Sequence, residues 1–253
     1  MNWQLATILG LSGICGLALW AAVYYCAYAV RSQVWGRTVW RGRADSNAVA
    51  LTFDDGPTLD TLDLLDILRR EKIKATFFLI GKQVERYPEI ARRIAADNHE
   101  IGNHSYSHPI YLFRSPSRTR LELQKTQNII MQTTGVTPRF SRPPCGVRTP
   151  AYFAAARELG LETIQWSDTG FDWKDFSAAQ IAQNVLKQIR SGSIILLHDG
   201  DSAGLRERRQ TVEAVPLILQ GLNARGLRIV SLAKFLSNDK TEFFTQEDEA
   251  ALI

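Results

Sequence analysis

The stretch "LTFDDGP" at residues 51–57 places two acidic side chains side by side at the end of an apolar run. Asp54 and Asp55 follow a buried-strand pattern and precede a Gly-Pro turn. A helix N-cap would account for one aspartate, but not for two. If one binds a cation, the other can stay free and accept a proton from water acidified by that cation. The pair therefore suggests a metal-assisted hydrolytic site, provided that further ligands lie nearby.

The segment "HSYSH" supplies such ligands, because His104 and His108 are four residues apart. On a helix or a tight turn this spacing lets both imidazoles face one point. Two neutral histidines and one carboxylate leave positions open for water and substrate, and Asp54 or Asp55 is the natural third ligand. Taken alone, the spacing fits solvated loop histidines better. The chain has only 4 histidines, however, and three of them fall on one predicted rim, which favours the metal site.

Three further segments carry polar residues with a chemical use. In "RPPCG", Arg142 either lies on the surface or clamps the free aspartate, holding it ionised and oriented. The same stiff loop can present a backbone N–H, that of Cys145, to an oxyanion. In "LLHD", His198 is either a core histidine or a general acid, and Asp172 in "FDWKD" can orient and stabilise its protonated ring.

The segments that must position these residues alternate between strand and helix patterns. About seven strand-helix units follow one another, which predicts a parallel sheet with helices outside, as a barrel or a doubly wound sheet. The candidate residues come just after strands, at the edge where parallel α/β folds bind ligands and carry out chemistry. The expected strands cover 48–53, 74–81, 99–105, 138–146, 161–166, 193–199 and 227–232, and the expected helices cover 58–72, 87–98, 117–135, 149–160, 177–192 and 208–226.

Composition excludes several classes of protein. The net charge is only +4, and basic patches interleaved with aromatic residues are absent, so nucleic acid is not an expected partner. Of the three cysteines, Cys15 and Cys26 lie in the apolar N-terminus and only Cys145 remains in the presumed domain. We therefore expect neither a disulfide within the domain nor a CxxC metal site.

The N-terminal stretch from Leu5 to Val30 holds no charged residue. As a helix it would be about 39 Å long, enough to cross a hydrocarbon core of about 30 Å. A cleaved signal peptide is the alternative, with "AYA" at 27–29 as its cleavage site, but no Lys or Arg precedes the run and the run is longer than usual. We therefore expect a retained single-pass transmembrane helix. The arginines that follow it would place the main domain in the cytoplasm by the positive-inside rule.

Together, "TFDDGP", "HSYSH", "RPPCG", "DTGFDW" and "LLHD" resemble the polysaccharide deacetylases, the NodB-homology fold of carbohydrate esterase family 4, in order and approximate spacing. The resemblance covers about residues 46–235. It implies an α/β fold, a distorted (β/α)7 TIM-like barrel, here preceded by the transmembrane helix. It also implies a hydrolase that removes N-acetyl or O-acetyl groups from a carbohydrate such as peptidoglycan, chitin oligomers or another envelope glycan.

By matching position, the resemblance implies roles for five polar residues. Asp54 corresponds to the catalytic base, and Arg142 to the residue that orients it. Asp55, His104 and His108 correspond to the metal triad. The implied cofactor is a divalent metal, Zn²⁺ in first place, with Co²⁺, Ni²⁺ and Mn²⁺ as alternatives.

The remaining matches concern the leaving group and the acetyl pocket. Asp172 would tune His198, the general acid, and Leu196 would line the acetyl pocket. Trp173 follows Asp172 as in the family and is expected beside the substrate. The backbone N–H of Cys145 would help to hold the oxyanion. This position is commonly aromatic in the family, so the cysteine puts the shape of the pocket in question.

These inferences divide the chain into a membrane anchor or uncleaved signal (1–31), a basic linker (32–46), the deacetylase domain (47–236) and an acidic tail (237–253). Because family members mostly act outside the cytoplasm, we expect the catalytic domain there, although the positive-inside rule disagrees. Two alternatives stay open: a deacetylase or deformylase of a lipid-linked sugar at the membrane, and a non-catalytic glycan-binding barrel. The sequence does not indicate an oligomeric state.

Overall fold

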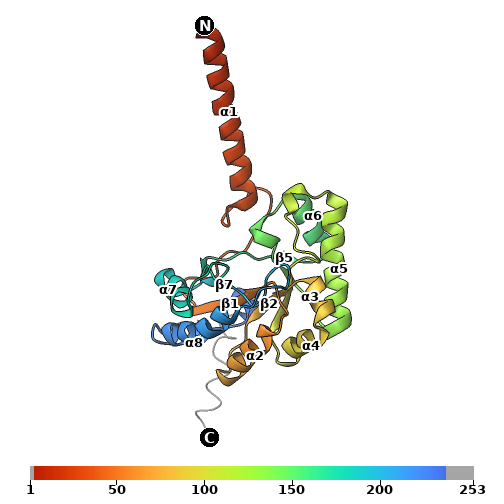
Figure 1. Ribbon diagram of the computed structural model, residues 1–253, viewed down its shortest axis with the longest axis vertical. Coiled ribbons are helices and arrows are strands. Elements are labelled where there is room, and N and C mark those ends of the chain that lie inside the picture. Colours follow the sequence, from red (N-terminus) through yellow and green to blue (C-terminus); the bar gives the residue numbers. More distant parts are fainter. Residues whose placement is uncertain (1–2, 238–253) are drawn as a thin grey trace.

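The computed structural model describes residues 3–237, and the side chains of its first helix from Ser12 onward. At its centre lies a curled sheet with the order β5-β4-β3-β2-β1-β7-β6, and β8 pairs with the start of β1. In the described chain all pairings between these strands are parallel, so the molecule is an α/β fold with a half-barrel sheet, consistent with a distorted (β/α)7 barrel (Figure 1). The strands are β1 (Ala48–Asp54), β2 (Thr76–Leu79), β3 (Glu100–Asn103), β4 (Phe140–Ser141), β5 (Glu162–Thr163), β6 (Asp168–Thr169), β7 (Ile194–His198) and β8 (Arg228–Ile229).

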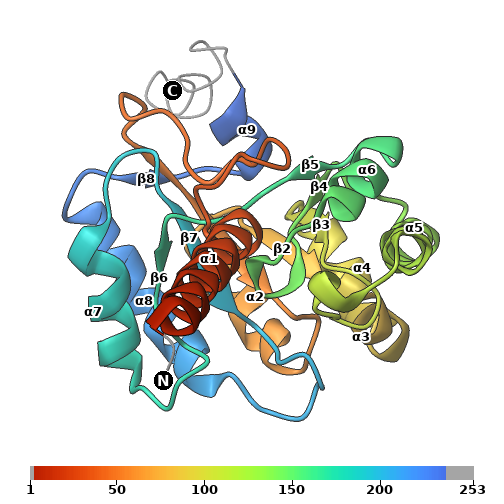
Figure 2. The ribbon, with the colours of Figure 1, turned by 90° about the horizontal axis from the view of Figure 1, so that it is seen from above.

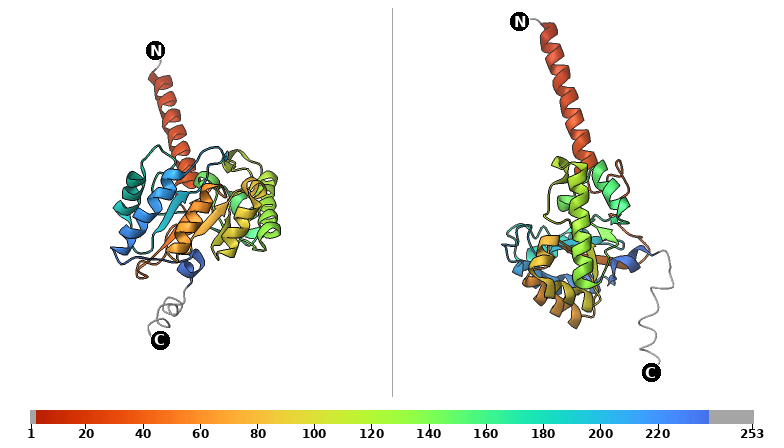
Figure 3. Two further views of the ribbon diagram at one scale, coloured as in Figure 1. Left: turned by 60° about the horizontal axis from the view of Figure 1, so that its bottom comes forward. Right: turned by 90° about the vertical axis from the view of Figure 1, so that its right-hand side faces the viewer.

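Helices alternate with the strands, and most of them pack around the outside of the sheet (Figure 3). Apolar side chains of many of these helices form the main cluster with the outward side chains of the central strands, as the alternation of strand and helix patterns predicts, and two smaller clusters complete the core. The helices are α1 (Trp3–Tyr28), α2 (Asp60–Arg70), α3 (Gly81–Arg86), α4 (Pro88–Ala96), α5 (Pro116–Thr134), α6 (Pro150–Glu158), α7 (Ala178–Gln188), α8 (Arg209–Asn223) and α9 (Leu232–Leu236), with short 3-10 helices η1 (Tyr111–Phe113) and η2 (Pro144–Gly146).

Side chains along the central strand β1 alternate between the apolar core and the inside of the curled sheet, because neighbouring residues of a strand point to opposite faces. Val49, Leu51 and Phe53 are buried in the main cluster between sheet and helices. The intervening positions face the inside of the curled sheet, where Thr52 and Asp54 are buried polar residues. The register continues this arrangement, because Asp54 lies opposite His198 of the neighbouring strand β7. The sheet therefore brings two candidate residues together although they are far apart in the sequence.

The segment predicted as a basic linker, 32–46, is hydrogen-bonded to the domain. Val39 forms a parallel bridge with Ile164, and Arg41 forms an antiparallel bridge with Ser193. The N–H of Gly42 also donates to the Gly192 carbonyl at 2.8 Å. The segment thus runs from the β5 edge of the sheet to the start of β7.

The helix α1 projects away from the domain, over the edge of the sheet at which the strands end (Figures 1 and 2). Across the side chains that the structure describes, no helix combines the length and the apolar character needed to cross a bilayer. The predicted anchor over residues 1–31 includes side chains outside that description, so it stays a prediction. The predicted acidic tail, apart from Ser237, also lies outside the described residues.

Candidate active site

The two adjacent aspartates reach the same site because the chain turns sharply between them. Asp54 is the last residue of β1, and Asp55 has a φ of 75°, in the left-handed region that non-glycine residues rarely adopt. Strict strand alternation would send neighbouring side chains to opposite faces, and this turn breaks the alternation. Both carboxylates are buried and line one pocket. Backbone strain of this kind is often found at functional sites.

Asp55 lies beside both histidines of the HSYSH loop. Its Oδ1 is 3.4 Å from Nε2 of His104 and 3.3 Å from Nε2 of His108. One ligand atom from each of the three residues can be chosen so that all lie within 4.8 Å of one another. The loop is fixed by its own hydrogen bonds, since the Asn103 side chain accepts the N–H of Ser105, and the Ser105 hydroxyl accepts the N–H of His108.

The donor set fits a divalent cation. Oδ1 of Asp55 is buried and has no hydrogen-bond partner among the described residues. Nδ1 of His104 lies 2.7 Å from the Arg142 carbonyl, a contact in which the ring nitrogen donates. In that tautomer Nε2 carries a lone pair directed to the same side as the Asp55 carboxylate. Two imidazoles and one carboxylate form a typical three-ligand set for Zn²⁺.

The charges of the triad depend on one another. Burial opposes ionisation of Asp55, but the nearby imidazoles, that of His104 above all, hold its pKa well below the usual range. Burial also opposes protonation of His104, and the carboxylates of Asp54 and Asp55 outweigh it, so the pKa of His104 is raised. Burial and the neighbouring His104 lower the pKa of His108 to about 4. At neutral pH His108 is therefore a neutral imidazole with a lone pair available for a metal.

Asp54 is held by a buried arginine. Nη1 of Arg142 donates to Oδ1 of Asp54 at 2.7 Å and to the hydroxyl of Thr52 at 2.7 Å, while Nη2 donates to the Gln165 carbonyl at 3.0 Å. The guanidinium also lies 4.2 Å from the ring centre of Phe78. Arg142 is fully buried, so this charge-assisted contact fixes the carboxylate in one orientation.

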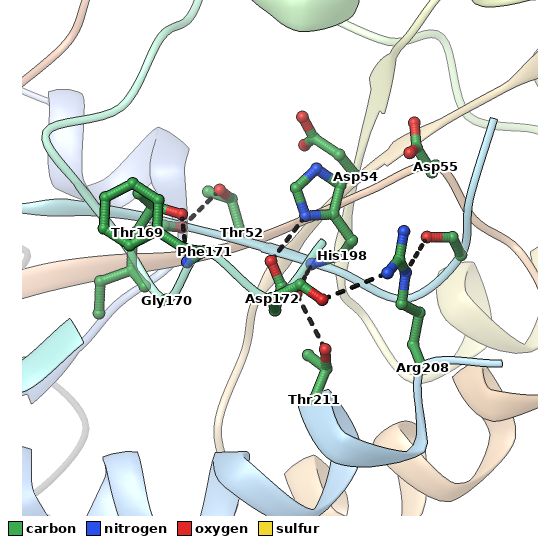
Figure 4. A network of polar contacts seen from close by, with 12 residues as sticks. Thr52, Asp54, Asp55, Thr169, Gly170, Phe171, Asp172, His198, Arg208 and Thr211 are labelled. Carbon is green, nitrogen blue, oxygen red and sulfur yellow. Dashed lines mark hydrogen bonds and ion pairs between the residues drawn. The ribbon is translucent and has the colours of Figure 1, made fainter. Parts of the chain in front are cut away.

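His198 and Asp172 form a second polar pair, and His198 lies on β7 next to Asp54 of β1 (Figure 4). Nδ1 of His198 is 2.9 Å from Oδ1 of Asp172, and the His198 backbone N–H donates to Oδ2 at 2.7 Å. The Thr211 hydroxyl donates to the same oxygen at 2.9 Å, and Arg208 donates to the Asp172 carbonyl at 3.2 Å. Burial opposes the charged imidazole, but Asp172 outweighs it, and the pKa of His198 is raised to about 9. The ring is therefore protonated at neutral pH.

Of the predicted catalytic and metal-binding residues, all except Arg142 and Asp172 line one pocket of about 510 Å³. Cys145, Leu196 and Trp173 line the same pocket, and the edge of the Trp173 ring contacts His198 at 5.5 Å between ring centres. The structure therefore brings every predicted site residue to this pocket or to the side chains that line it.

Several pocket residues are not among the sequence candidates. Trp166 follows β5, and Arg206 and Arg208 come from the loop after β7. The two arginines belong to "RERR", the one basic run in the sequence, which could have drawn attention to them. Gln165 and Thr211 act from behind the lining and carry no sequence signal, because their partners are a backbone carbonyl and a distant carboxylate.

Comparison with known proteins finds one family by both sequence and structure. The family model described as polysaccharide deacetylase matches residues 41–164. A peptidoglycan-N-acetylglucosamine deacetylase of Bacillus cereus is 39% identical over 193 residues, which cover 76% of this chain and 69% of that protein. The crystal structure of the Bc1960 peptidoglycan N-acetylglucosamine deacetylase superimposes with a TM-score of 0.74 at 37% identity, over 80% of this chain and 94% of that one. A CE4 family pseudoenzyme from Bacillus anthracis superimposes with a TM-score of 0.73 at 30% identity, over 79% and 69% of the two chains.

Proposed function

The chain belongs to the polysaccharide deacetylase family, and from this membership and the site geometry we propose that it hydrolyses N-acetyl groups on a glycan of the peptidoglycan type. The membership predicted from the five motifs is confirmed. One observation carries the proposal for this chain: a carboxylate held by a buried arginine and a protonated histidine held by a carboxylate line the same pocket as a three-ligand cation site. That combination supplies a base, an acid and an electrophile in one pocket.

The first step is attack by water on the acetyl carbonyl carbon. Asp55, His104 and His108 would hold the cation, which when bound polarises the carbonyl and acidifies water. Asp54 accepts the proton of the attacking water, while Arg142 keeps its carboxylate turned to the site. The product of this step is a tetrahedral oxyanion. We assign the backbone N–H of Cys145 to that oxygen, because Cys145 lines the pocket beside both aspartates.

The second step breaks the bond between carbonyl carbon and nitrogen. His198 donates its proton to the departing nitrogen, which leaves as an amine, and the acetyl group leaves as acetate. Asp172 stabilises the protonated ring before the transfer and orients it through Nδ1, so that Nε2 is the donor. Leu196 and Trp173 line the pocket and give the acetyl methyl group an apolar surface.

The test is hydrolysis by the full chain of peptidoglycan, N-acetylglucosamine oligomers and acetylated xylan, with acetate release measured before and after treatment with a chelator. We expect release from the first two substrates, its loss with chelator and its return when Zn²⁺ is added. The non-catalytic alternative, which the similarity to a pseudoenzyme keeps in view, predicts binding without acetate release. No release from any substrate at any metal loading would refute the proposed activity.

A second candidate substrate is an acetylated sugar carried on a membrane lipid. α1 stands over the edge of the sheet where the pocket lies (Figure 2). Its described part exposes apolar side chains such as Leu17 and Trp20. Phe113 at the end of η1, after β3, and Leu205 in the loop after β7 are each about 80% exposed. We propose a single-pass anchor with the domain outside the cytoplasm. Faster acetate release from undecaprenyl-linked sugar than from polymer would favour this candidate, and a reporter fused after residue 240 tests the orientation.

A further inference from the structure

Arg148 is a fully buried arginine whose hydrogen-bond partners are all backbone carbonyls. Its guanidinium donates to Ala27 at 3.4 Å, to Ser32 at 3.3 Å, to Gly146 at 2.8 Å and also to Ala29. Its backbone N–H donates to Ala27 at 3.2 Å. No carboxylate of the described chain forms an ion pair with it. We call this guanidinium and its four carbonyls the Arg148 clasp.

One side of the clasp belongs to the end of α1. Ala27 lies in the last turn of the helix and Ala29 just beyond it. The final carbonyls of a helix lack partners within it and carry the negative end of the helix dipole. A buried guanidinium there satisfies these carbonyls and finds partial negative charge in place of a carboxylate. Ala27 is itself fully buried, so the helix end is docked on the domain (Figure 1).

The other side of the clasp belongs to the loop that lines the pocket. The Gly146 carbonyl accepts from Arg148 at 2.8 Å and from the Gln165 side chain at 2.9 Å. Gly146 has a φ of +69°, and a Cβ added there would lie 2.8 Å from the Trp166 ring. The loop is therefore fixed by two donors and by the absence of a side chain. Its neighbour Cys145 faces the pocket, also at a positive φ.

We propose that Arg148 is a positioning residue for the oxyanion donor, and that the end of α1 is part of the active-site architecture. The clasp fixes the peptide between Gly146 and Val147. The Gly146 N–H donates to the Pro143 carbonyl at 2.9 Å, so the turn that carries the Cys145 N–H is held from both ends. This inference rests on the proposed function in one respect, namely that the Cys145 N–H binds the oxyanion. A donor that serves the oxyanion acts in the transition state, so misplacing it lowers kcat and leaves KM nearly unchanged.

The clasp can be opened from either side in the full chain. Arg148→Gln removes the guanidinium, and Ala27→Leu forces a larger side chain into a fully buried position at the helix end. Matched controls are Ala22→Leu, at an exposed position of the same helix, and Arg139→Gln, which removes an exposed arginine paired with Glu162. Arg148→Lys keeps the charge but cannot reach all four carbonyls, and it should retain intermediate activity.

We expect Arg148→Gln and Ala27→Leu each to lower kcat about 10- to 100-fold, with KM and bound zinc within about two-fold of wild type. Because both open the same clasp, the double variant should lose no more than the worse single variant. Unchanged kcat in either variant would overturn the proposal. So would a joint loss of kcat, zinc and melting temperature, since that pattern describes a general structural role.

A second readout separates this inference from the proposed function. Hydrogen exchange of the amides of residues 145–148 reports the clasp whether or not acetate is released. We expect exchange at least about 10-fold faster in Arg148→Gln and Ala27→Leu, with the amides of β1 unchanged and Ala22→Leu like wild type. Protected amides in both variants would refute the clasp even if the enzyme deacetylates. An inactive wild type with the expected exchange pattern would refute the proposed function and leave the clasp supported.

Discussion

At the scale of single residues, the two adjacent aspartates have separate tasks because they have separate partners. Asp54 contacts the guanidinium of Arg142, whereas Asp55 has a buried oxygen without a hydrogen bond beside two imidazoles. A carboxylate that is already paired serves best as an oriented base. A carboxylate with an unused oxygen is the one that a cation would take.

The division of labour predicts opposite outcomes for two conservative changes. Asp54→Asn should lower kcat by about 10²–10⁴-fold and leave the zinc content intact, because it removes only the proton acceptor. Asp55→Asn should lose bound zinc first, with activity partly restored by excess metal. Steady-state kinetics combined with metal analysis measures both. If Asp54→Asn loses zinc and Asp55→Asn retains it, the assigned roles are reversed and the mechanism is wrong.

The contact between His198 and Asp172 sets the alkaline limit of activity. His198 donates its proton, so activity falls as pH rises through its pKa, which is about 9 with Asp172 in place. A bound cation works against the charged ring and moves this limit downward. Asp172→Asn removes the largest favourable influence on the protonated ring, so the alkaline limb of kcat/KM should move to lower pH by at least about one unit.

The matched control is Thr211→Val, which removes one hydrogen bond to Asp172 but keeps the carboxylate charge. We expect a much smaller displacement of the alkaline limb in this variant. If the alkaline limb of kcat/KM stays at the same pH in Asp172→Asn, a different group supplies the proton.

Residues of the site differ in how far the sequence reveals them. Asp54, Asp55, His104, His108 and Arg142 stand in motifs whose residue types already suggest chemistry. Arg148 lies two residues beyond the same RPPCG motif, yet nothing in the sequence predicts its role, because three of its four partners are carbonyls of a segment more than a hundred residues away. Backbone partners leave no residue-type signal, so only the structure identifies them.

At the scale of elements, the long periodic segments were predictable and the short ones were not. The helices expected over 58–72 and 117–135 correspond to α2 and α5. A repeated apolar face defines the first, and Gly135 closes the second at a φ of 76°. The strand expected over 161–166 forms a ladder only at Glu162–Thr163, and the strand over 227–232 only at Arg228–Ile229. In the first of these segments Ile164 pairs instead with Val39 of the 32–46 segment, and its side chain is buried in the core.

His99, just before β3, is expected to make the stability of the folded state sensitive to acid. Nδ1 of His99 accepts the N–H of Ala75 at 3.2 Å, and its ring packs edge-on against Phe77. Burial, with a smaller effect of Lys74, lowers the pKa of His99 to about 4, against about 6.5 in an unfolded chain. The folded state thus favours the neutral ring. Its contribution is complete above about pH 6.5 and is lost as the pH falls toward 4.

His99→Asn keeps an acceptor for the Ala75 N–H but removes the titration. Between pH 7 and pH 5 we expect wild type to lose about 2 kcal/mol more unfolding free energy than the variant, as 1.5 units at 1.36 kcal/mol each imply. Urea unfolding at both pH values measures this difference. Equal losses in the two proteins would show that the ring is protonated, or accessible to water, in the folded state.

At the scale of the whole molecule, the chain before the first strand completes the domain. The sequence of residues 32–46 predicts a linker, because it is basic and has no helix or strand periodicity. A segment that pairs through backbone hydrogen bonds needs neither apolar side chains nor such a periodicity. Val39 makes backbone hydrogen bonds to the two residues that flank Ile164. Its N–H donates to the Thr163 carbonyl at 2.9 Å, and its carbonyl accepts from the N–H of Gln165 at 2.7 Å. This segment reaches Gln165, which in turn holds the pocket loop through Gly146.

The bridge at Val39 predicts that the domain depends on this segment for stability. Val39→Pro removes the N–H and leaves the Thr163 carbonyl without its donor, whereas Val39→Ala keeps the backbone bonds and trims only the side chain. We expect the proline variant to be about 1–3 kcal/mol less stable than the alanine variant in urea unfolding of the full chain. Because the 39–41 segment contacts both the β5 edge and the start of β7, the loss should appear in the single global transition. Equal stability of the two variants would mean that the sheet does not depend on the hydrogen bonds of this segment. The segment would then be a linker, as its sequence predicts.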